Sequence, residues 1–315
     1  MTMTPRMIAA LALVPALLTG CGAATAESTT GSVRTVETTL GKVSVPTDID
    51  SVVVLEGRRD LDIVLSLGLP LTGYPYEEKG SLDLTSPTAD ALETAQQNGA
   101  KELFLADEIN LEAIIGADPD LIVSRAEDVE PIRAELEAIA PVIAIGDQST
   151  STWQDDLELV AAATGTEDRA QTLIEDYSTR VSALKDQYGP ALRENTFVPL
   201  SYNGESLEVR PNRLLSLNLR DLGATPSKAF QDAIDGEEVA FSPEQTVEGF
   251  ADASAVVALI NDKQVWDDFQ DNSLVKQLPA FQDGNVTRGD KQTHEGAALT
   301  AQHNLTVIEQ LLKTL

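Results

Sequence analysis

The stretch from residue 166 to residue 189 can form one long helix, and this restricts the folds open to the chain. Its apolar residues recur at steps of three and four, which places on one helix face Ala170, Leu173, Ile174, Tyr177, Val181, Leu184 and Tyr188. Gly189 and Pro190 signal its end. Such a helix spans roughly 35 Å, about the diameter of a small domain. Because blocks of similar size flank it, we predict a helix that joins two lobes.

The charge of the chain argues against one large class of partners. The 315 residues include 22 basic and 51 acidic side chains, with a net charge of -29. Nucleic-acid binding depends on a basic surface, so we expect no nucleic-acid partner. The hydrophobic content of 42% is sufficient for the cores of two domains.

The N-terminus has the pattern of an export signal. Arg6 precedes an apolar run at residues 7–18, which is too short to span a bilayer and is typical of a secretory signal peptide. The run ends in Leu-Leu-Thr-Gly-Cys, which resembles the lipobox of a bacterial lipoprotein. We therefore predict a signal peptide at 1–20, a lipidated Cys21, a flexible tether at 21–32 and an extracytoplasmic, membrane-anchored protein. The alternative is ordinary signal cleavage with a stray cysteine.

Alternating strands and helices predict the class of both lobes. The runs at 51–55, 121–124 and 142–145 are apolar except for Ser51 and Ser124 and are typical of buried parallel strands, with helices expected between them at 60–67 and 128–140. Residues 77–98 are polar and predict a surface loop with at most one helical turn. The second block repeats the order, with strands at 196–202 and 254–260 and helices at 214–222 and 299–312. We predict α/β lobes at 33–150 and 191–315, joined by a helical linker at 151–190.

Several segments together resemble a known family. Residues 110–124 read NLEAIIGADPDLIVS and residues 136–145 read LEAIAPVIAI; GKVSVP and LSLGLPLTG precede them at 41–46 and 65–73. This set resembles the helical-backbone substrate-binding proteins of ABC importers, the class III or type 2 periplasmic binding proteins for iron-siderophores and cobalamin.

The resemblance implies a fold and a function. The fold is two Rossmann-like lobes with mostly parallel central sheets, one long interlobe α-helix and a ligand cleft between the lobes. The function is capture of an iron(III)-siderophore complex and its delivery to an ABC permease, without catalysis and with iron present only inside the siderophore. Cobalamin or haem is the alternative ligand within the class, and a surface adhesion lipoprotein is the alternative class. We expect a monomer that closes little on binding, because a stiff helical connection resists hinge bending.

Ligands of open α/β sheets bind beyond the carboxyl ends of the strands, so residues that follow predicted strands are candidates. Guanidinium groups suit carboxylate, hydroxamate or catecholate oxygens, and tyrosines combine an apolar face with a polar tip. The candidate ligand-binding residues are Arg58, Arg59, Tyr74, Tyr76, Arg125, Tyr202, Arg210, Arg213 and His294, with Asn203 beside them. Of the adjacent Arg58 and Arg59, we expect one to face inward. The arginines favour an anionic or carboxylate-containing chelate.

Other candidates have different roles. The resemblance implies that one acidic residue on each lobe docks on the permease, and Glu112 and Glu244 occupy the matching motif positions. Trp153 and Trp266 are expected to serve in packing. His294 and His303 are the only histidines, which is too few for a direct metal site.

Overall fold

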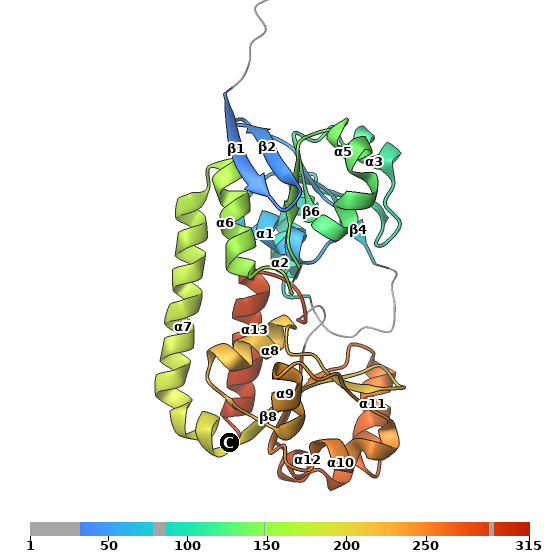
Figure 1. The fold of residues 1–315 in the computed structure, drawn as a ribbon, viewed down its shortest axis with the longest axis vertical. Coiled ribbons are helices and arrows are strands. Elements are labelled where there is room, and N and C mark those ends of the chain that lie inside the picture. The colour runs from blue at the N-terminus through green and yellow to red at the C-terminus, as the bar shows by residue number, and fades with distance from the viewer. Residues whose placement is uncertain (1–31, 78–85, 148, 290–292) are drawn as a thin grey trace, which may run out of the picture. The chain divides into compact units, whose positions relative to one another are not determined.

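Two β-sheets, one from each half of the chain, form the framework of the fold, and a long helix runs past both (Figure 1). The computed structural model describes residues 32–77, 86–147, 149–289 and 293–315. The predicted signal peptide, Cys21 and nearly all of the predicted tether lie outside the described residues.

The first sheet is entirely parallel, in the order β5-β4-β3-β6-β7. Its strands are β3 (Val52–Val54), β4 (Leu71–Tyr76), β5 (Lys101–Leu105), β6 (Leu121–Arg125) and β7 (Val142–Ile145). The three valines of β3 are fully buried, as expected for a strand covered on both faces. The chain leaves β3 toward one edge and returns to the other at β6, so the strand order reverses between these two strands. A separate antiparallel hairpin, β1 (Val33–Thr38) and β2 (Gly41–Pro46), precedes the sheet.

The helices of the first lobe differ from prediction at two places. They are α1 (Arg59–Leu67), α2 (Ala89–Gln97), α3 (Leu111–Gly116), α4 (Ala126–Val129), α5 (Arg133–Glu137) and α6 (Trp153–Thr164). The single helix expected at 128–140 is broken, because Pro131 lies in a 3₁₀ turn, Glu130–Ile132, between α4 and α5. The loop expected at 77–98 contains α2. Because α2 buries none of its residues, its sequence has no strong apolar stripe from which a helix could be predicted.

The second sheet is mixed, in the order β11-β9-β8-β12-β13, with β10 paired to β8. The strands are β8 (Thr196–Tyr202), β9 (Leu207–Val209), β10 (Thr225–Pro226), β11 (Val239–Phe241), β12 (Ala255–Leu259) and β13 (Val286–Arg288). β8, β10, β12 and β13 are parallel, whereas β9 and β11 add an antiparallel edge. Its helices include α8 (Leu214–Asp221), α9 (Lys228–Ile234), α10 (Thr246–Phe250), α11 (Lys263–Asp271), α12 (Pro279–Asp283) and α13 (Ala298–Leu312).

The predicted long helix is α7 (Glu167–Glu194), which continues five residues beyond the expected end. Gly189 and Pro190, which were expected to end the helix, follow a kink instead. Tyr188 has non-helical backbone angles, and Pro190 lies in the short helical segment after it. Ala170, Tyr177 and Leu184 of the predicted stripe are buried. Near its start, the Arg169 side chain donates a hydrogen bond to the carbonyl oxygen of Ser66 in α1. Farther along, α7 packs against α13, and near its end it contacts β10 of the second sheet.

A second helix, α13, also reaches both lobes (Figure 1). It packs along α7 and α8, and its N-terminal end meets α1 of the first lobe. There the buried carboxylate of Asp62 accepts hydrogen bonds from the backbone N–H groups of Ala297, Leu299 and Thr300 at 2.7, 3.0 and 2.9 Å, and from the Thr300 hydroxyl at 2.6 Å. The helix has no cap from its own N-cap residue. Asp62 therefore supplies, from the other lobe, the negative charge and the acceptors that a helix N-terminus requires.

A polar chain that is buried at Asn218 and Asn304 joins the middle of α7 and α13 to the C-terminal end of α8. The Tyr177 hydroxyl donates to Asp221 at 2.6 Å and accepts from the Asn218 amide, and Asn304 of α13 donates to Asn218. Burial, followed by the Asp221 carboxylate, raises the pKa of Tyr177, so the hydroxyl remains a donor. Trp153 packs edge-on against the Tyr177 ring with centroids 5.4 Å apart, consistent with its expected packing role.

The Asp62 contact predicts a large loss of stability on substitution. Asp62→Ala should lower the free energy of unfolding by about 3 kcal/mol or more, because several buried donors lose their acceptor together. Urea unfolding measures this loss. Asp168→Ala, which removes an exposed carboxylate from the first turn of α7, is the matched control and should cost less than about 1 kcal/mol. Equal losses in the two variants would contradict the assigned role of Asp62.

Candidate functional site

The reversal of strand order in the first sheet defines one wall of the site. Ligands in such sheets bind outside the carboxyl ends of the strands that flank the reversal. Arg58 follows β3 and precedes α1, and Arg125 is the last residue of β6. The two arginines predicted after these strands therefore lie at the expected crevice.

Two buried carboxylates lie between these arginines. Glu56 Oε1 is 3.7 Å from Arg58 Nη1 and 3.8 Å from Arg125 Nη1. Glu295, from the segment that precedes α13, is 3.7 Å from Arg58 Nη1 and 3.5 Å from Arg125 Nη1. Burial, followed by the neighbouring carboxylates Asp60 and Glu295, raises the pKa of Glu56 well above its usual range. Burial alone would lower the pKa of Arg125, but nearby carboxylates, led by Glu56, raise it instead.

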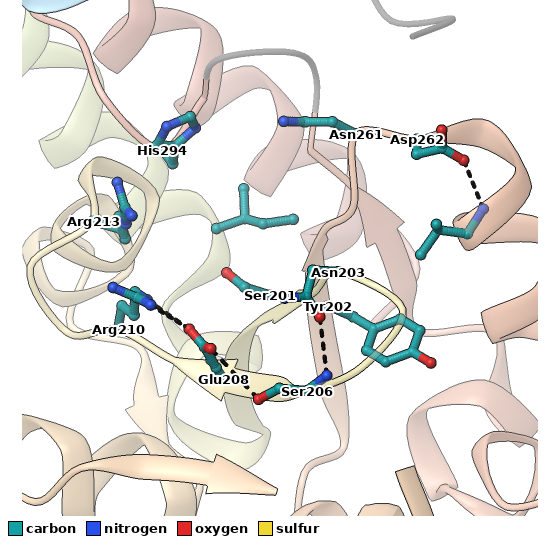
Figure 2. A pocket seen from close by; sticks show the side chains of 12 residues that line it. Ser201, Tyr202, Asn203, Ser206, Glu208, Arg210, Arg213, Asn261, Asp262 and His294 are labelled. Carbon is teal, nitrogen blue, oxygen red and sulfur yellow. Dashed lines mark hydrogen bonds and ion pairs between the residues drawn. The ribbon is translucent and has the colours of Figure 1, made fainter. Parts of the chain in front are cut away.

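The carboxyl ends of β8 and β12 form the opposite wall, around a cavity of about 450 Å³ (Figure 2). Most of the residues that line it carry a polar group, although apolar atoms supply more than half of its surface: Ser201, Tyr202, Asn203, Ser206, Glu208, Arg210, Arg213, Leu259, Asn261, Asp262, Val265 and His294. In Figure 2, Arg210, Arg213 and His294 lie on one side of the cavity, and Asn261 and Asp262 lie on the other. Ser201 and Leu259 are paired in register on adjacent parallel strands, which brings the two loops that follow them together.

The two arginines of this cavity differ in their partners. Arg210 binds Glu208 with a nitrogen–oxygen distance of 2.6 Å. Arg213 has no carboxylate at ion-pairing distance among the described residues. Burial lowers the pKa of Arg213; the Glu295 carboxylate opposes this shift, whereas the positive charges of Arg210 and Arg58 add to it. The group stays charged at neutral pH. Arg213 is therefore a half-buried cation available to an anionic ligand group.

A second cavity, of about 370 Å³, shares Arg210 and Arg213 with the first. Arg125 and Glu295 also line it, so it extends from the second-lobe cavity to the crevice of the first sheet. The structure thus brings together six of the nine predicted ligand-binding residues: Arg58, Arg125, Tyr202, Arg210, Arg213 and His294.

His294 enters the first cavity as a neutral imidazole. Burial, with the positive charges of Arg213 and Arg58, lowers its pKa to about 3. It therefore offers one donor and one acceptor without adding charge at physiological pH.

Three predicted residues lie elsewhere. Arg59 is 1% exposed and binds Asp156 at 2.7 Å, so the structure does not support its predicted contact with ligand. A fully buried guanidinium needs such a partner, and α6 supplies it. Tyr74 is also buried and accepts a hydrogen bond from Gln96. Tyr74 and the partly exposed Tyr76 line a separate cavity of about 190 Å³ next to Glu56.

Prediction from the sequence missed Glu56, Glu295, Ser206 and Asn261. Glu56 lies in the loop after β3 and has the same position after a strand as Arg58, but a lone acidic residue in so acidic a chain is a weak signal for an anion-binding site. Glu295 and Ser206 follow no predicted strand, so no sequence signal distinguishes them. Trp266, expected in edge packing, packs against Phe269 with the Arg288 guanidinium 5.7 Å from its ring.

The two candidate docking residues have matching environments. Glu112 is exposed in the first turn of α3, which begins after the capping residue Asn110. Glu244 is exposed in the first turn of the 3₁₀ helix Pro243–Gln245, which begins after the capping residue Ser242. Glu112 and Glu244 are therefore both solvent-exposed at the start of a helix, one on each lobe.

No helix in the described parts of the chain is long and apolar enough to cross a membrane. No group of three or more His, Cys, Asp or Glu side chains in those ranges is placed to hold a metal ion.

The chain matches the model of a known protein family over most of its length. The model of the periplasmic binding protein family matches residues 83–293. The chain belongs to this family. Membership confirms the predicted family and accounts for the two sheets and the helix α7.

Individual relatives of the chain are also binding proteins of iron and siderophore uptake. The probable siderophore-binding lipoprotein YfiY of Bacillus subtilis is 31% identical over 181 residues, which are 57% of this chain and 53% of YfiY. The iron(3+)-hydroxamate-binding protein FhuD of the same organism is 29% identical over 44% of each chain. The chain thus spans about half the length of these curated relatives.

Solved structures match a larger share of this chain than the curated relatives do. The siderophore periplasmic binding protein from the fuscachelin gene cluster of Thermobifida fusca has a TM-score of 0.67 and 26% identity, over 85% of this chain and 98% of that one. A second structure is that of the triscatecholate siderophore-binding protein FeuA of Bacillus subtilis, solved with ferri-bacillibactin. It has a TM-score of 0.72, and the match covers 89% of this chain and 98% of FeuA. Its identity is 17%, so this match shows the fold alone. The predicted fold class is confirmed.

Proposed function

We propose that the protein is an extracytoplasmic solute-binding protein that captures an iron(III)-siderophore complex and delivers it to an ABC permease. The main support for this proposal is Arg213, a half-buried cation at the junction of two cavities between the sheets, with no carboxylate at ion-pairing distance in the described parts of the chain. YfiY and the Thermobifida fusca protein, both named for siderophores, support the choice of ligand.

The chemistry of the lining supports an oxygen-rich chelate. Hydroxyl, amide, imidazole and guanidinium groups line the larger cavity, together with the carboxylates of Glu208 and Asp262 and, among the described residues, the apolar side chains of Leu259 and Val265. The hydroxyl, amide, imidazole and guanidinium groups can donate hydrogen bonds to the oxygen atoms of a chelate.

The protein is proposed to bind without performing a reaction. The periplasmic binding protein family consists of substrate-binding proteins, and the ferric complex enters and leaves unchanged. Iron is held by the chelator, and the protein holds the chelator. Membrane attachment through a lipid on Cys21 and action as a monomer remain parts of the same proposal.

A titration with matched variants tests the ligand and the site together. Intrinsic fluorescence and calorimetry would be followed on adding ferric hydroxamates, ferric catecholates, ferric citrate, haem and cobalamin. We expect saturable binding of a ferric siderophore, with Arg213→Gln weakening affinity about 10-fold or more through loss of a charged hydrogen bond.

Arg220→Gln is the control, because Arg220 is an exposed arginine at the other end of α8. It should leave affinity unchanged. Absence of calorimetric binding to every ferric complex would contradict the proposed function. Equal effects of the two substitutions would contradict the assigned site.

The docking proposal predicts a separation of binding from uptake. Glu112→Arg combined with Glu244→Arg should abolish uptake of the ferric complex by cells while ligand affinity stays intact, since both side chains are exposed and outside the cavities. Radioactive iron uptake measures transport. Glu135→Arg with Glu194→Arg makes the same change in charge at exposed positions and should transport normally. Normal uptake by the first double variant would exclude Glu112 and Glu244 as docking residues.

A further inference from the structure

Glu295 is a buried carboxylate placed inside the candidate binding site. Its side chain is 5% exposed, and it lines the cavity shared with Arg125, Arg210 and Arg213. Burying a carboxylate is costly unless it is paired, so such a residue in a cleft calls for an explanation.

The partners of Glu295 are the two arginines that a ligand would be expected to use. Arg58 Nη1 and Arg125 Nη1 lie 3.7 and 3.5 Å from its two carboxylate oxygens. Both arginines lie at the strand reversal of the first sheet, where ligands of this sheet type bind. Glu295 comes from the segment that precedes α13 and pairs with both of these arginines.

The backbone on both sides of Glu295 is fixed. The carbonyl oxygen of His294 accepts a hydrogen bond from Leu214 N–H at 2.9 Å, and Ala297 N–H donates to Asp62 at 2.7 Å. At Gly296, an added Cβ atom would overlap the Thr300 side chain and lie 3.0 Å from Asp62 Oδ2. These contacts hold the Glu295 carboxylate between the arginines.

The arginines of the crevice already have carboxylate partners before any ligand arrives. Arg58 lies within 4 Å of Glu56, Glu77 and Glu295. Arg125 lies within 4 Å of Glu56, Glu127, Asp128 and Glu295, and Glu208 pairs with Arg210. Arg213 is left as the cation without a carboxylate partner in the described part of the site. A site with one available positive charge suits a complex of low negative charge.

We propose that Glu295 is a specificity-determining residue, a built-in counter-anion that selects ferric complexes of low negative charge against strongly anionic ones. The inference rests on the proposed function and names the substrate class of the same site. Three hydroxamate groups neutralise ferric iron, whereas three catecholates leave an excess of negative charge. A tris-catecholate must bring that excess close to the Glu295 carboxylate, in a site where repulsion is poorly screened. A trihydroxamate meets no such repulsion.

The test compares a neutral and an anionic probe by calorimetry. Ferrichrome serves as the neutral ferric trihydroxamate and ferric enterobactin as the anionic tris-catecholate. The wild-type protein should bind ferrichrome more tightly. Glu295→Gln should raise affinity for ferric enterobactin about 10-fold or more, because one negative charge close to the ligand is removed. Affinity for ferrichrome should change less than about 3-fold.

Two controls separate charge from shape and from general effects. Glu295→Asp keeps the charge and should keep the wild-type preference. Glu309→Gln removes a carboxylate that pairs with Arg180 and Lys313, outside both cavities, and should change neither affinity.

The outcomes separate the inference from the proposed function. Tighter wild-type binding of ferric enterobactin than of ferrichrome overturns the inference without any variant, so the test does not depend on the folding of Glu295→Gln. The inference is also overturned if Glu295→Gln changes the affinities for ferrichrome and ferric enterobactin by the same factor, or changes neither. Both of these results leave the proposed function in place. If neither the wild-type protein nor Glu295→Gln binds any ferric complex, the proposed function fails and the inference fails with it.

Discussion

The hydrogen bonds from α13 to Asp62 are the contact on which the arrangement of the site depends. One buried carboxylate in α1 receives three backbone N–H groups and one hydroxyl from the start of the last helix, 235 to 238 residues farther along the chain. The first lobe thereby caps a helix that packs mainly on the second. Together with α7, this gives the lobes two helical connections, and it fixes the segment that carries His294 and Glu295.

Both walls of the candidate site follow from the same rule of sheet topology. The first sheet reverses its strand order between β3 and β6, and the second places the ends of β8 and β12 side by side. The loops after these strands carry arginines on one side and hydroxyl, amide and guanidinium groups on the other. Charge then distinguishes the arginines. Arg58, Arg125 and Arg210 already have carboxylate partners, whereas Arg213 has none in the described part of the chain.

The elements that could be predicted from the sequence are those with a local signal. The stripe of α7 and the apolar runs of β3, β6 and β7 follow from periodicity and burial, and the arginines follow from their places after strands. Strand β5 and helix α2 escaped prediction because they bury few or no side chains. Asp62 and Glu295 escaped it for another reason. Each is one acid among 51 acidic residues, and its role arises from a partner far away in the chain.

We propose that a ferric complex binds between the two sheets, beside Arg213. Crystals grown with ferrichrome, with data recorded at the iron absorption edge, would locate the iron. We expect one strong anomalous peak inside the cavities lined by Ser201, Asn261, Arg213 and Glu295. An iron peak at the cavity beside Tyr74 and Tyr76 or on the outer surface, or no peak from crystals saturated with the complex, would contradict it.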